Sequence, residues 1–409
     1  MHILMLTQLF QPEPNHLKGL SFARELQRRG HAVEVLTGFP NYPGGRLYPG
    51  YRIRWCVRET IDGVPVVRVP VYPSHNQSGL QRSLCYGSFA LSAGLWGVRC
   101  VRRPDVVHVY QGPATLAWPA MVLRRRLGVP YVLDVQDLWP DSVTASGMFR
   151  LPGGGRLLNR WCRETYRKAA RIVVLSEGYK SLLLERGVPP EKIDVVYNWC
   201  DEPSVSVPAD APGDAPFPTA GRFNVVFAGN MGTVQALPSV VAAARLVENT
   251  CPQVQFVFVG DGVQRQRLQE SALAAGLRNV RFVPRQPARA MGRLFGLADA
   301  LLIHLKDGPL TRVGIPQKTQ AYMAAGRPII VAVRGDTAEL VRRARAGVAC
   351  EPENPEALAH AVHTMAAMPP AERQALADNG RRFYRAELSF DVGVNRMVGV
   401  FDRALQGKA

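Results

Sequence analysis

Glycine turns followed by lysines form the clearest chemical pattern in the sequence. Two apolar runs, 225–228 and 256–259, each lead into a glycine turn, Gly229-Asn230-Met231-Gly232 and Gly260-Asp261-Gly262. A strand that enters such a turn before a helix brings backbone N–H groups close to an anion such as a pyrophosphate. One glycine turn alone also ends strands for steric reasons. Several turns at one sheet edge, with Lys306 and Lys318 nearby, favour a diphosphate cradle.

Polar side chains in the first half also follow predicted strands. Asn15, His16 and Gly19 come after the first strand, His108, Tyr110 and Gln111 end another, and Asp137 ends the next. Asp137 is the best candidate for orienting an acceptor hydroxyl or a donor sugar, although it could also cap a helix that begins at Leu138. His108 alternates with valines, so a satisfied core histidine is an equal alternative to a catalytic one.

The elements that would position these residues are short apolar runs alternating with helical patterns. Strands are expected at 3–7, 31–37, 64–70, 105–110, 131–135, 171–175, 193–197, 224–228, 255–259, 280–283, 300–304 and 329–333. Helices are expected at 17–29, 357–368, 370–388 and 392–405. This alternation predicts an α/β protein with parallel sheets. The Pro-, Ala- and Asp-rich stretch 201–221 has no apolar period and is typical of a linker between two domains.

Composition narrows the class of protein. The 409 residues suit two domains, and the net charge of +17 suggests a polyanionic partner, although GC-rich coding would also produce an excess of arginine. No helix-turn-helix, zinc or stacking signature supports nucleic-acid binding. The seven cysteines form no Cys-x-x-Cys pair, which is typical of reduced thiols in the cytosol, and we expect no metal site. No apolar run is long enough to predict a transmembrane helix.

The charge-free stretch 84–98 is flanked by Arg82 and Arg99, with Arg102 and Arg103 beyond. It is too short to span a bilayer. A core helix and a helix half-buried in an anionic membrane surface both fit this pattern.

Motifs along nearly the whole chain resemble the family 4 retaining glycosyltransferases, in particular the branch that builds bacterial O-antigen, capsule and exopolysaccharide repeat units. The motifs are Arg29-Gly30-His31-Ala32-Val33, Pro40-Asn41-Tyr42-Pro43, Arg103-Pro104-Asp105-Val106-Val107-His108, Asp137-Leu138-Trp139-Pro140-Asp141-Ser142, the glycine turns above, Ile315-Pro316-Gln317-Lys318 and Tyr322-Met323-Ala324-Ala325-Gly326-Arg327-Pro328.

The resemblance implies a GT-B fold, in which two Rossmann-like domains face each other across a cleft. It implies an acceptor-binding domain at 1–202, a linker at 203–220, a nucleotide-sugar donor domain at 221–388, and a final helix at 389–409 that packs back on the first domain. It implies transfer without a metal or cofactor. The donor is expected to be a nucleotide sugar, with UDP favoured, and the acceptor a polyprenyl-diphosphate-linked or other glycan. The protein is expected in the cytoplasm, at the inner face of the cytoplasmic membrane.

Without a metal, positive side chains must offset the leaving diphosphate, and one well-placed donor typically contributes about 3 kcal/mol. Lys318 and Lys306 are the candidates for this role. The candidate catalytic residues are Lys318 together with Asp137 and His108 from the first half of the chain. The candidate substrate-binding residues are Asn15, His16, Gly19, Tyr110, Gln111, Gly229, Asn230, Gly232, Arg285, Lys306, Gln317 and Gln320.

Three positions depart from the family pattern. Val313 and Ala321 replace the paired glutamates, the later of which holds the ribose, and Gln235 replaces a lysine that often follows the glycine turn. Gln317, Gln320 or Lys318 is left to take over the ribose. A nucleotide-sugar epimerase of the same fold is the alternative function, and an inactive relative is a further one.

Overall fold

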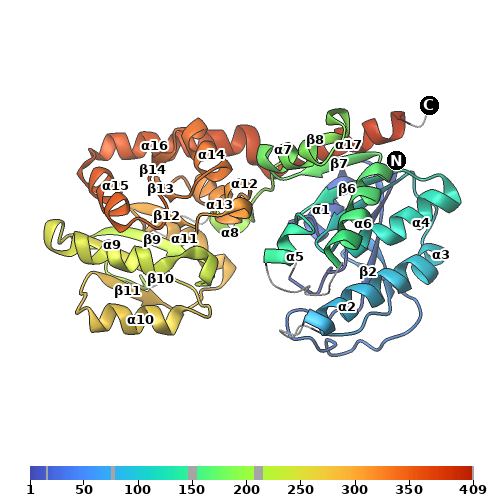
Figure 1. Cartoon of the computed structure of the whole chain (residues 1–409), viewed down its shortest axis with the longest axis horizontal. Coiled ribbons are helices and arrows are strands. Elements are labelled where there is room, and N and C mark those ends of the chain that lie inside the picture. The colour runs from blue at the N-terminus through green and yellow to red at the C-terminus, as the bar shows by residue number, and fades with distance from the viewer. Residues whose placement is uncertain (15–16, 75–78, 146–153, 207–214, 408–409) are drawn as a thin grey trace. The chain divides into compact units, whose positions relative to one another are not determined.

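The chain folds into two compact α/β units in the computed structural model, which describes residues 1–14, 17–74, 79–145, 154–206 and 215–407 (Figure 1). Unit 1 comprises Met1–Tyr197 and Val394–Ala409, and unit 2 comprises Asn198–Gly393. The expected site residues Asn15 and His16 lie outside the described residues.

The sheet of unit 1 has eight strands in the order β3-β4-β2-β1-β5-β6-β7-β8. All neighbours pair in parallel except β3 and β4, which form an antiparallel hairpin. The strands are β1 (His2–Leu6), β2 (Ala32–Gly38), β3 (Val57–Ile61), β4 (Val64–Val69), β5 (Val106–Gln111), β6 (Tyr131–Val135), β7 (Arg171–Val174) and β8 (Ile193–Val195).

Helices connect the parallel strands of unit 1. They are α1 (Leu20–Arg28), α2 (Gly79–Ser92), α3 (Val98–Cys100), α4 (Ala117–Leu127), α5 (Asp141–Ala145), α6 (Gly154–Lys168) and α7 (Glu177–Glu185). A π-helical turn, η1 (Ala93–Gly97), joins α2 to α3. Short 3-10 turns lie at Ala114–Leu116 (η2) and Pro190–Lys192 (η3).

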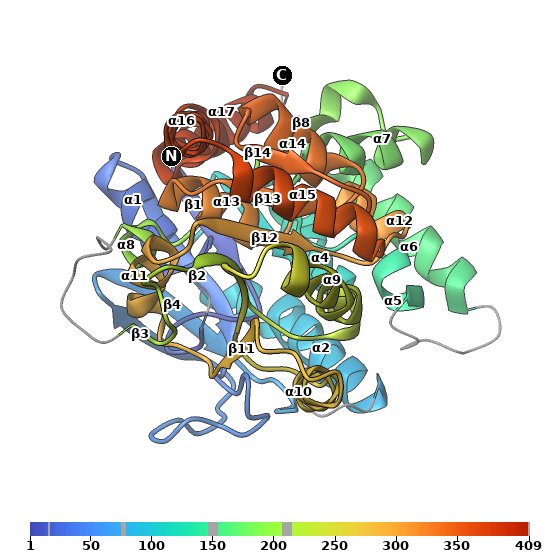
Figure 2. The same cartoon turned by 90° about the vertical axis from the view of Figure 1, so that its left-hand side faces the viewer.

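Unit 2 has a six-stranded parallel sheet in the order β11-β10-β9-β12-β13-β14, and Figure 2 shows β11 and β14 at its opposite edges. The strands are β9 (Phe223–Ala228), β10 (Val254–Val259), β11 (Val280–Val283), β12 (Ala300–His304), β13 (Ile329–Ala332) and β14 (Gly347–Ala349). Every residue of β9 and β10 is buried, as expected for central parallel strands covered by helices on both faces.

Helices of unit 2 cover this sheet, and α9 packs beside α15 over one face of it (Figure 1). The helices are α8 (Glu202–Val205), α9 (Leu237–Thr250), α10 (Arg265–Ala274), α11 (Met291–Gly296), α12 (Pro309–Val313), α13 (Gln317–Ala325), α14 (Asp336–Ala344), α15 (Pro355–Ala367) and α16 (Pro370–Phe383). The 3-10 turns η4 (Thr233–Gln235) and η5 (Ala288–Ala290) and the π turn η6 (Tyr384–Leu388) complete the unit. The last helix, α17 (Phe390–Gln406), begins in unit 2 and continues into unit 1.

The expected fold class, two Rossmann-like α/β units, is confirmed. Three features differ from the expectation: the antiparallel strand β3, the short edge strand β14, and the π turn inside the stretch 84–98. The helix α8 lies within the stretch expected to be an irregular linker. Among the helices of the described residues, none is both long and apolar enough to cross a membrane.

Candidate active site

The glycine turns of unit 2 line one cavity of about 750 Å³. Gly229 and Asn230 follow β9, Gly260 and Gly262 follow β10, and Arg285 follows β11, so adjacent parallel strands deliver all of them to one sheet edge. The structure thus brings together the expected residues Gly229, Asn230 and Arg285.

The two turns touch each other through their backbones. A Cβ atom on Gly260 would lie 2.1 Å from the carbonyl oxygen of Gly229, and one on Gly262 would lie 2.6 Å from that of Met231. Gly229 and Gly260 also have φ angles of 140° and 136°, which L side chains rarely adopt. Only glycine fits at these contacts, and the result is a surface of bare backbone.

Lys318 lies beside this surface, at the second residue of α13. Its Nζ is buried, lies 3.7 Å from the centre of the Phe227 ring, and would be 3.1 Å from a Cβ on Gly229. It has no hydrogen-bond partner within the described residues. Burial lowers the pKa of Lys318 to about 7. An unpaired buried ammonium is costly, which is typical of a group that awaits an anionic ligand.

The other residues expected around the diphosphate have separate roles. Gln320 is buried, and in the amide orientation that satisfies both bonds its nitrogen donates to the carbonyls of Pro316 and Gln317 at 2.9 and 3.1 Å. These bonds hold the Gln320 side chain against its own helix, and Gln320 does not line the cavity. Lys306 and Gln317 are exposed and do not line the cavity.

Gln235, which stands where the family pattern often has a lysine, closes the turn at residues 229–232. The Gln235 side chain accepts a hydrogen bond from the backbone N–H of Gly232 at 3.0 Å. The Gln235 carbonyl in turn lies 2.8 Å from Nδ1 of the buried His304. Gly232 therefore shapes the turn without lining the cavity itself.

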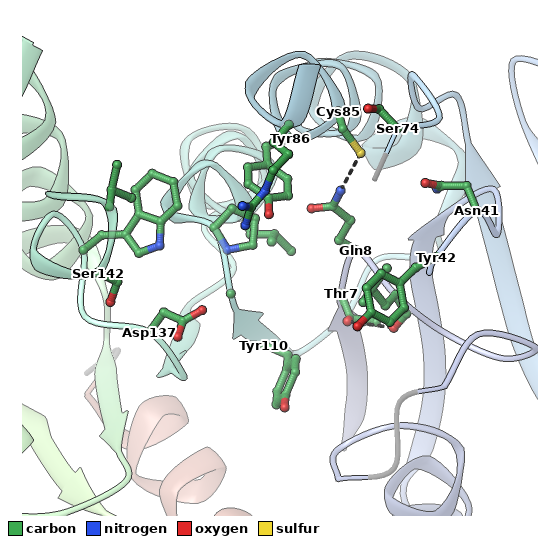
Figure 3. Close-up of a pocket in the computed structure, with 17 residues that line it drawn as sticks. Thr7, Gln8, Asn41, Tyr42, Ser74, Cys85, Tyr86, Tyr110, Asp137 and Ser142 are labelled. Carbon is green, nitrogen blue, oxygen red and sulfur yellow. Dashed lines mark hydrogen bonds between the residues drawn. The ribbon is translucent and has the colours of Figure 1, made fainter. Parts of the chain in front are cut away.

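Unit 1 has its own cavity, of about 390 Å³, at the carboxyl ends of β1, β5 and β6 (Figure 3). Tyr110 from the end of β5 and Asp137 after β6 both line it, as do aromatic side chains that the sequence did not mark as site residues. The lining includes Tyr42, Tyr86, Trp139, Arg82, Gln8 and Asn41. Aromatic walls with a few polar groups suit a sugar ring.

Among the described residues that line this cavity, Asp137 is the only carboxylate. Its side chain is open to the cavity and forms no hydrogen bond or ion pair with the described residues. The surrounding protein nevertheless raises the pKa of the Asp137 carboxyl above its ordinary value, through burial alone. Asp137 is therefore available to accept a hydrogen bond from a ligand hydroxyl.

His108 belongs to the core of unit 1 and does not line the cavity, which corrects its expected catalytic role. Its Nε2 lies 3.0 Å from Asp134, whose Oδ2 also accepts a hydrogen bond from Lys18 at 2.6 Å. All three side chains are fully buried. Burial alone would raise the pKa of Asp134, but the neighbouring Lys18 and His108 side chains lower it. Burial also lowers the pKa of His108. The structure gives this trio a structural role.

Two more expected residues lie away from the cavity. Gln111, at the end of β5, is buried and does not line it. Gly19 caps the N-terminus of α1.

A buried carboxylate that the sequence did not mark holds one wall of the cavity. Oε1 of Glu13 accepts hydrogen bonds from the backbone N–H groups of Asn41 and Tyr42, both at 2.7 Å. Glu13 is fully buried, and burial raises the pKa of its carboxyl despite these bonds. The loop motif that contains Asn41 and Tyr42 was the available signal, but it did not indicate which cavity the loop borders.

Potential metal ligands do not gather in the described part of the chain, where no three His, Cys, Asp or Glu side chains form a group. Metal-independent transfer stays a prediction.

Two family models match consecutive parts of this chain. A glycosyl transferase 4-like domain matches residues 20–199, and a glycosyl transferases group 1 domain matches residues 222–367. WbjE of Pseudomonas aeruginosa, a glycosyltransferase by name, is 30% identical over 64% of this chain and 66% of its own length. WcaI of Escherichia coli, whose name assigns it to colanic acid biosynthesis as a glycosyl transferase, is 29% identical over 84% of this chain and 86% of its own.

Solved structures share the fold at low sequence identity. HepE of Anabaena, solved with UDP and glucose, superposes with a TM-score of 0.67 at 15% identity, covering 98% of this chain and 99% of that one. Sucrose-phosphate synthase of Thermosynechococcus elongatus superposes with a TM-score of 0.70 at 16% identity, covering 99% of each chain.

Proposed function

This chain belongs to the family of glycosyltransferases with a 4-like and a group 1 domain, and we propose that it transfers a sugar, with retention, from a nucleoside diphosphate sugar to an acceptor hydroxyl in surface polysaccharide synthesis. The name of the relative WcaI refers to colanic acid biosynthesis. UDP is the proposed nucleotide because HepE, of the same fold, was solved with UDP.

The observation that carries the proposal is that the Nζ of Lys318, which has no hydrogen-bond partner, lies beside the exposed backbone of the turn at Gly229. A diphosphate placed there can approach the backbone closely and meets the ammonium of Lys318, which stabilises the charge that grows on the leaving group. The N–H groups of Gly229 and Gly260 already donate to the carbonyls of Val259 and Val283, so the charge of Lys318 carries this role. Arg285 in the same cavity adds a second cation. In this proposal no metal is needed for departure of the nucleoside diphosphate.

The cavity of unit 1 is the proposed acceptor site. Its aromatic side chains stack against a sugar ring, and the open carboxylate of Asp137 accepts a hydrogen bond from the attacking hydroxyl. Asp137 orients that hydroxyl, and the departing phosphate takes its proton during front-face transfer.

A thermal-shift titration with UDP, GDP and dTDP, followed by turnover of the matching nucleotide sugars, tests the proposal. A nucleotide at 100 times its dissociation constant stabilises the protein by about 2.7 kcal/mol. Release of nucleoside diphosphate should rise when an acceptor is added. Full sugar turnover without any acceptor would instead support the epimerase alternative, which the named relatives do not favour.

The proposed location is the cytoplasm, at the inner face of the cytoplasmic membrane, with a glycan or polyprenyl-diphosphate-linked acceptor. Exposed Leu95 and Trp96, within the stretch 84–98, support this location. Flotation with liposomes across a salt series tests it, because salt weakens charge-driven binding more than insertion of apolar side chains.

A further inference from the structure

Gln8 lines the cavity of unit 1, two residues after the end of β1. Its backbone is held on both sides. The Thr37 hydroxyl donates to the Gln8 carbonyl at 3.2 Å, and the Thr7 hydroxyl donates to the next carbonyl, that of Leu9, at 3.0 Å. The Gln8 side chain is only 8% exposed. The protein therefore fixes the position of this amide group before any ligand binds.

The nitrogen of the Gln8 amide is bonded to the protein. Nε2 donates to Sγ of the buried Cys85, on α2, at 3.2 Å. Burial raises the pKa of the Cys85 thiol above its ordinary value, against a hydrogen bond from the Ser74 backbone to the same sulfur. Cys85 therefore stays a neutral thiol that holds the Gln8 nitrogen on one side and leaves the oxygen on the other.

The oxygen of the Gln8 amide has no such bond. Oε1 is buried and has no hydrogen-bond partner within the described residues. Figure 3 shows this oxygen pointing away from Cys85, toward the interior of the cavity. A buried carbonyl oxygen without a partner is destabilising, so we expect the missing donor to come from a ligand.

A group that only donates hydrogen bonds suits this oxygen best. A sugar hydroxyl that donates to Oε1 brings lone pairs of its own, and the nearby Nε2 already donates to Cys85. A protonated amine would bring a charge into a neutral, buried place. An acetamido N–H has neither drawback, because its nitrogen accepts no hydrogen bond and carries no charge. Its methyl group suits the apolar residues of the same lining, which are Leu9, Cys85, Pro113, Leu116 and Val143.

We propose that Gln8 is a specificity-determining residue of the cavity of unit 1, where Oε1 accepts a hydrogen bond from the acetamido N–H of an N-acetylamino sugar in the acceptor. Cys85 is the positioning residue that sets the orientation of the Gln8 amide. This inference rests on the proposed function, because it assumes that the cavity holds the acceptor. Asp137 then bonds the attacking hydroxyl, and Gln8 selects which sugar presents it.

NMR titration with p-nitrophenyl glycosides tests the assignment. The probes form two pairs, the α-N-acetylglucosaminide with the α-glucoside and the α-N-acetylgalactosaminide with the α-galactoside. In at least one pair the wild-type protein should bind the acetamido sugar about tenfold more tightly, the effect of one hydrogen bond to a buried amide. Gln8→Leu should remove this preference. Gln81→Leu, on α2 but outside the lining of the cavity, is the matched control and should keep it.

Conservative variants separate the two ends of the Gln8 amide. Gln8→Glu keeps an oxygen that accepts hydrogen bonds and should keep the preference. If it loses the preference as Gln8→Leu does, the ligand meets Nε2 and the assignment of Oε1 is wrong. Cys85→Ala should lower the preference about threefold, because the amide is then free to turn, and Cys85→Ser should restore it. Melting temperatures confirm that each variant is folded, and the Cys85 pair tests the inference even if Gln8→Leu is not.

Three results would overturn the inference. If the hydroxyl sugars lose as much affinity as the acetamido sugars in Gln8→Leu, Oε1 binds a hydroxyl and the acetamido assignment is wrong. It is also wrong if neither acetamido sugar binds the wild type, or if both members of each pair bind equally. Stabilisation by UDP reports on unit 2 alone. Its absence would refute the proposed function, whereas its persistence without an acetamido preference would refute only the inference about Gln8.

Discussion

Replacing Lys318 by methionine should make the protein more stable while removing its ability to bind the donor. Methionine has a similar length and packs well against the Phe227 ring, but it carries no charge. Burial without a hydrogen-bond partner lowers the pKa of Lys318 from 10.5 to about 7. At about 1.4 kcal/mol per pKa unit, this shift corresponds to a destabilisation on the order of 5 kcal/mol, which we take as an upper bound.

The gain in stability should depend on pH in a defined direction. Between pH 7 and 10.5 the amine of Lys318 is protonated in the unfolded chain and neutral in the folded one. The unfolded state therefore binds more protons, and wild-type stability rises with pH across this window. Below pH 7 both states are protonated and the full penalty is present. The advantage of Lys318→Met should thus be largest at or below pH 7 and shrink by about 1.4 kcal/mol per pH unit above it.

Urea unfolding at pH 6.5, 8 and 9.5, followed through the transition of unit 2, measures this difference. Lys306→Met is the matched control, because Lys306 is exposed and its replacement should change stability little at any pH. Thermal shift with UDP measures binding, which should weaken at least tenfold in Lys318→Met and little in the control. A variant that is no more stable than the wild type, or that binds UDP normally, would refute the assignment of an unpaired ammonium awaiting a diphosphate.

Three further outcomes follow from the geometry. Asp137→Asn should lower kcat/KM for the acceptor about 100-fold with UDP binding intact. Because the pKa of Asp137 is raised, the wild-type rate should fall as the pH falls and this carboxylate is protonated, and Asp137→Asn should lack that fall. An unchanged pH profile would exclude this role. Gly260→Ala should lower the free energy of unfolding by more than about 3 kcal/mol and abolish stabilisation by UDP. Gly308→Ala, whose Cβ would meet only ordinary contacts, should have neither effect in the same melting assay. Transfer should continue in EDTA, and a complete loss that magnesium or manganese restores would overturn the metal-free mechanism.

The central strands were predictable because their sequences are largely apolar runs. The expected strands at 131–135 and 300–304 match the central strands β6 and β12 to the residue, and the expected strand at 280–283 matches the edge strand β11. Strand β3 was missed because its edge position leaves alternate residues polar, so the run Val57–Ile61 lacks the apolar signal of a buried strand. The Asp62-Gly63 turn that follows was the available sign of a hairpin.

Residues of the candidate site were predictable only where they directly follow the end of a parallel strand. Gly229, Gly260 and Asp137 each follow a parallel strand, and topology alone places such residues at a ligand-binding edge. His108 lies inside β5 and Gln320 inside α13, and both side chains are buried, which the sequence did not decide. Arg82 comes from a distant helix, and no local pattern assigns it to the cavity.

The helix α17 has a consequence for how the protein is made. Its second part belongs to unit 1, where the Phe401 ring packs at 5.7 Å against His108 and Arg403 bonds to Asp194 at 2.8 Å. A ribosome that adds about 5–20 residues per second needs roughly 10–40 s to synthesise unit 2 before Phe401 emerges. During that interval unit 1 waits with the His108 face of its core uncovered, and at its end unit 2 has all its own residues. Unit 1 is therefore synthesised first but completes its folding last, and it is the unit that most needs a chaperone that shields nascent chains.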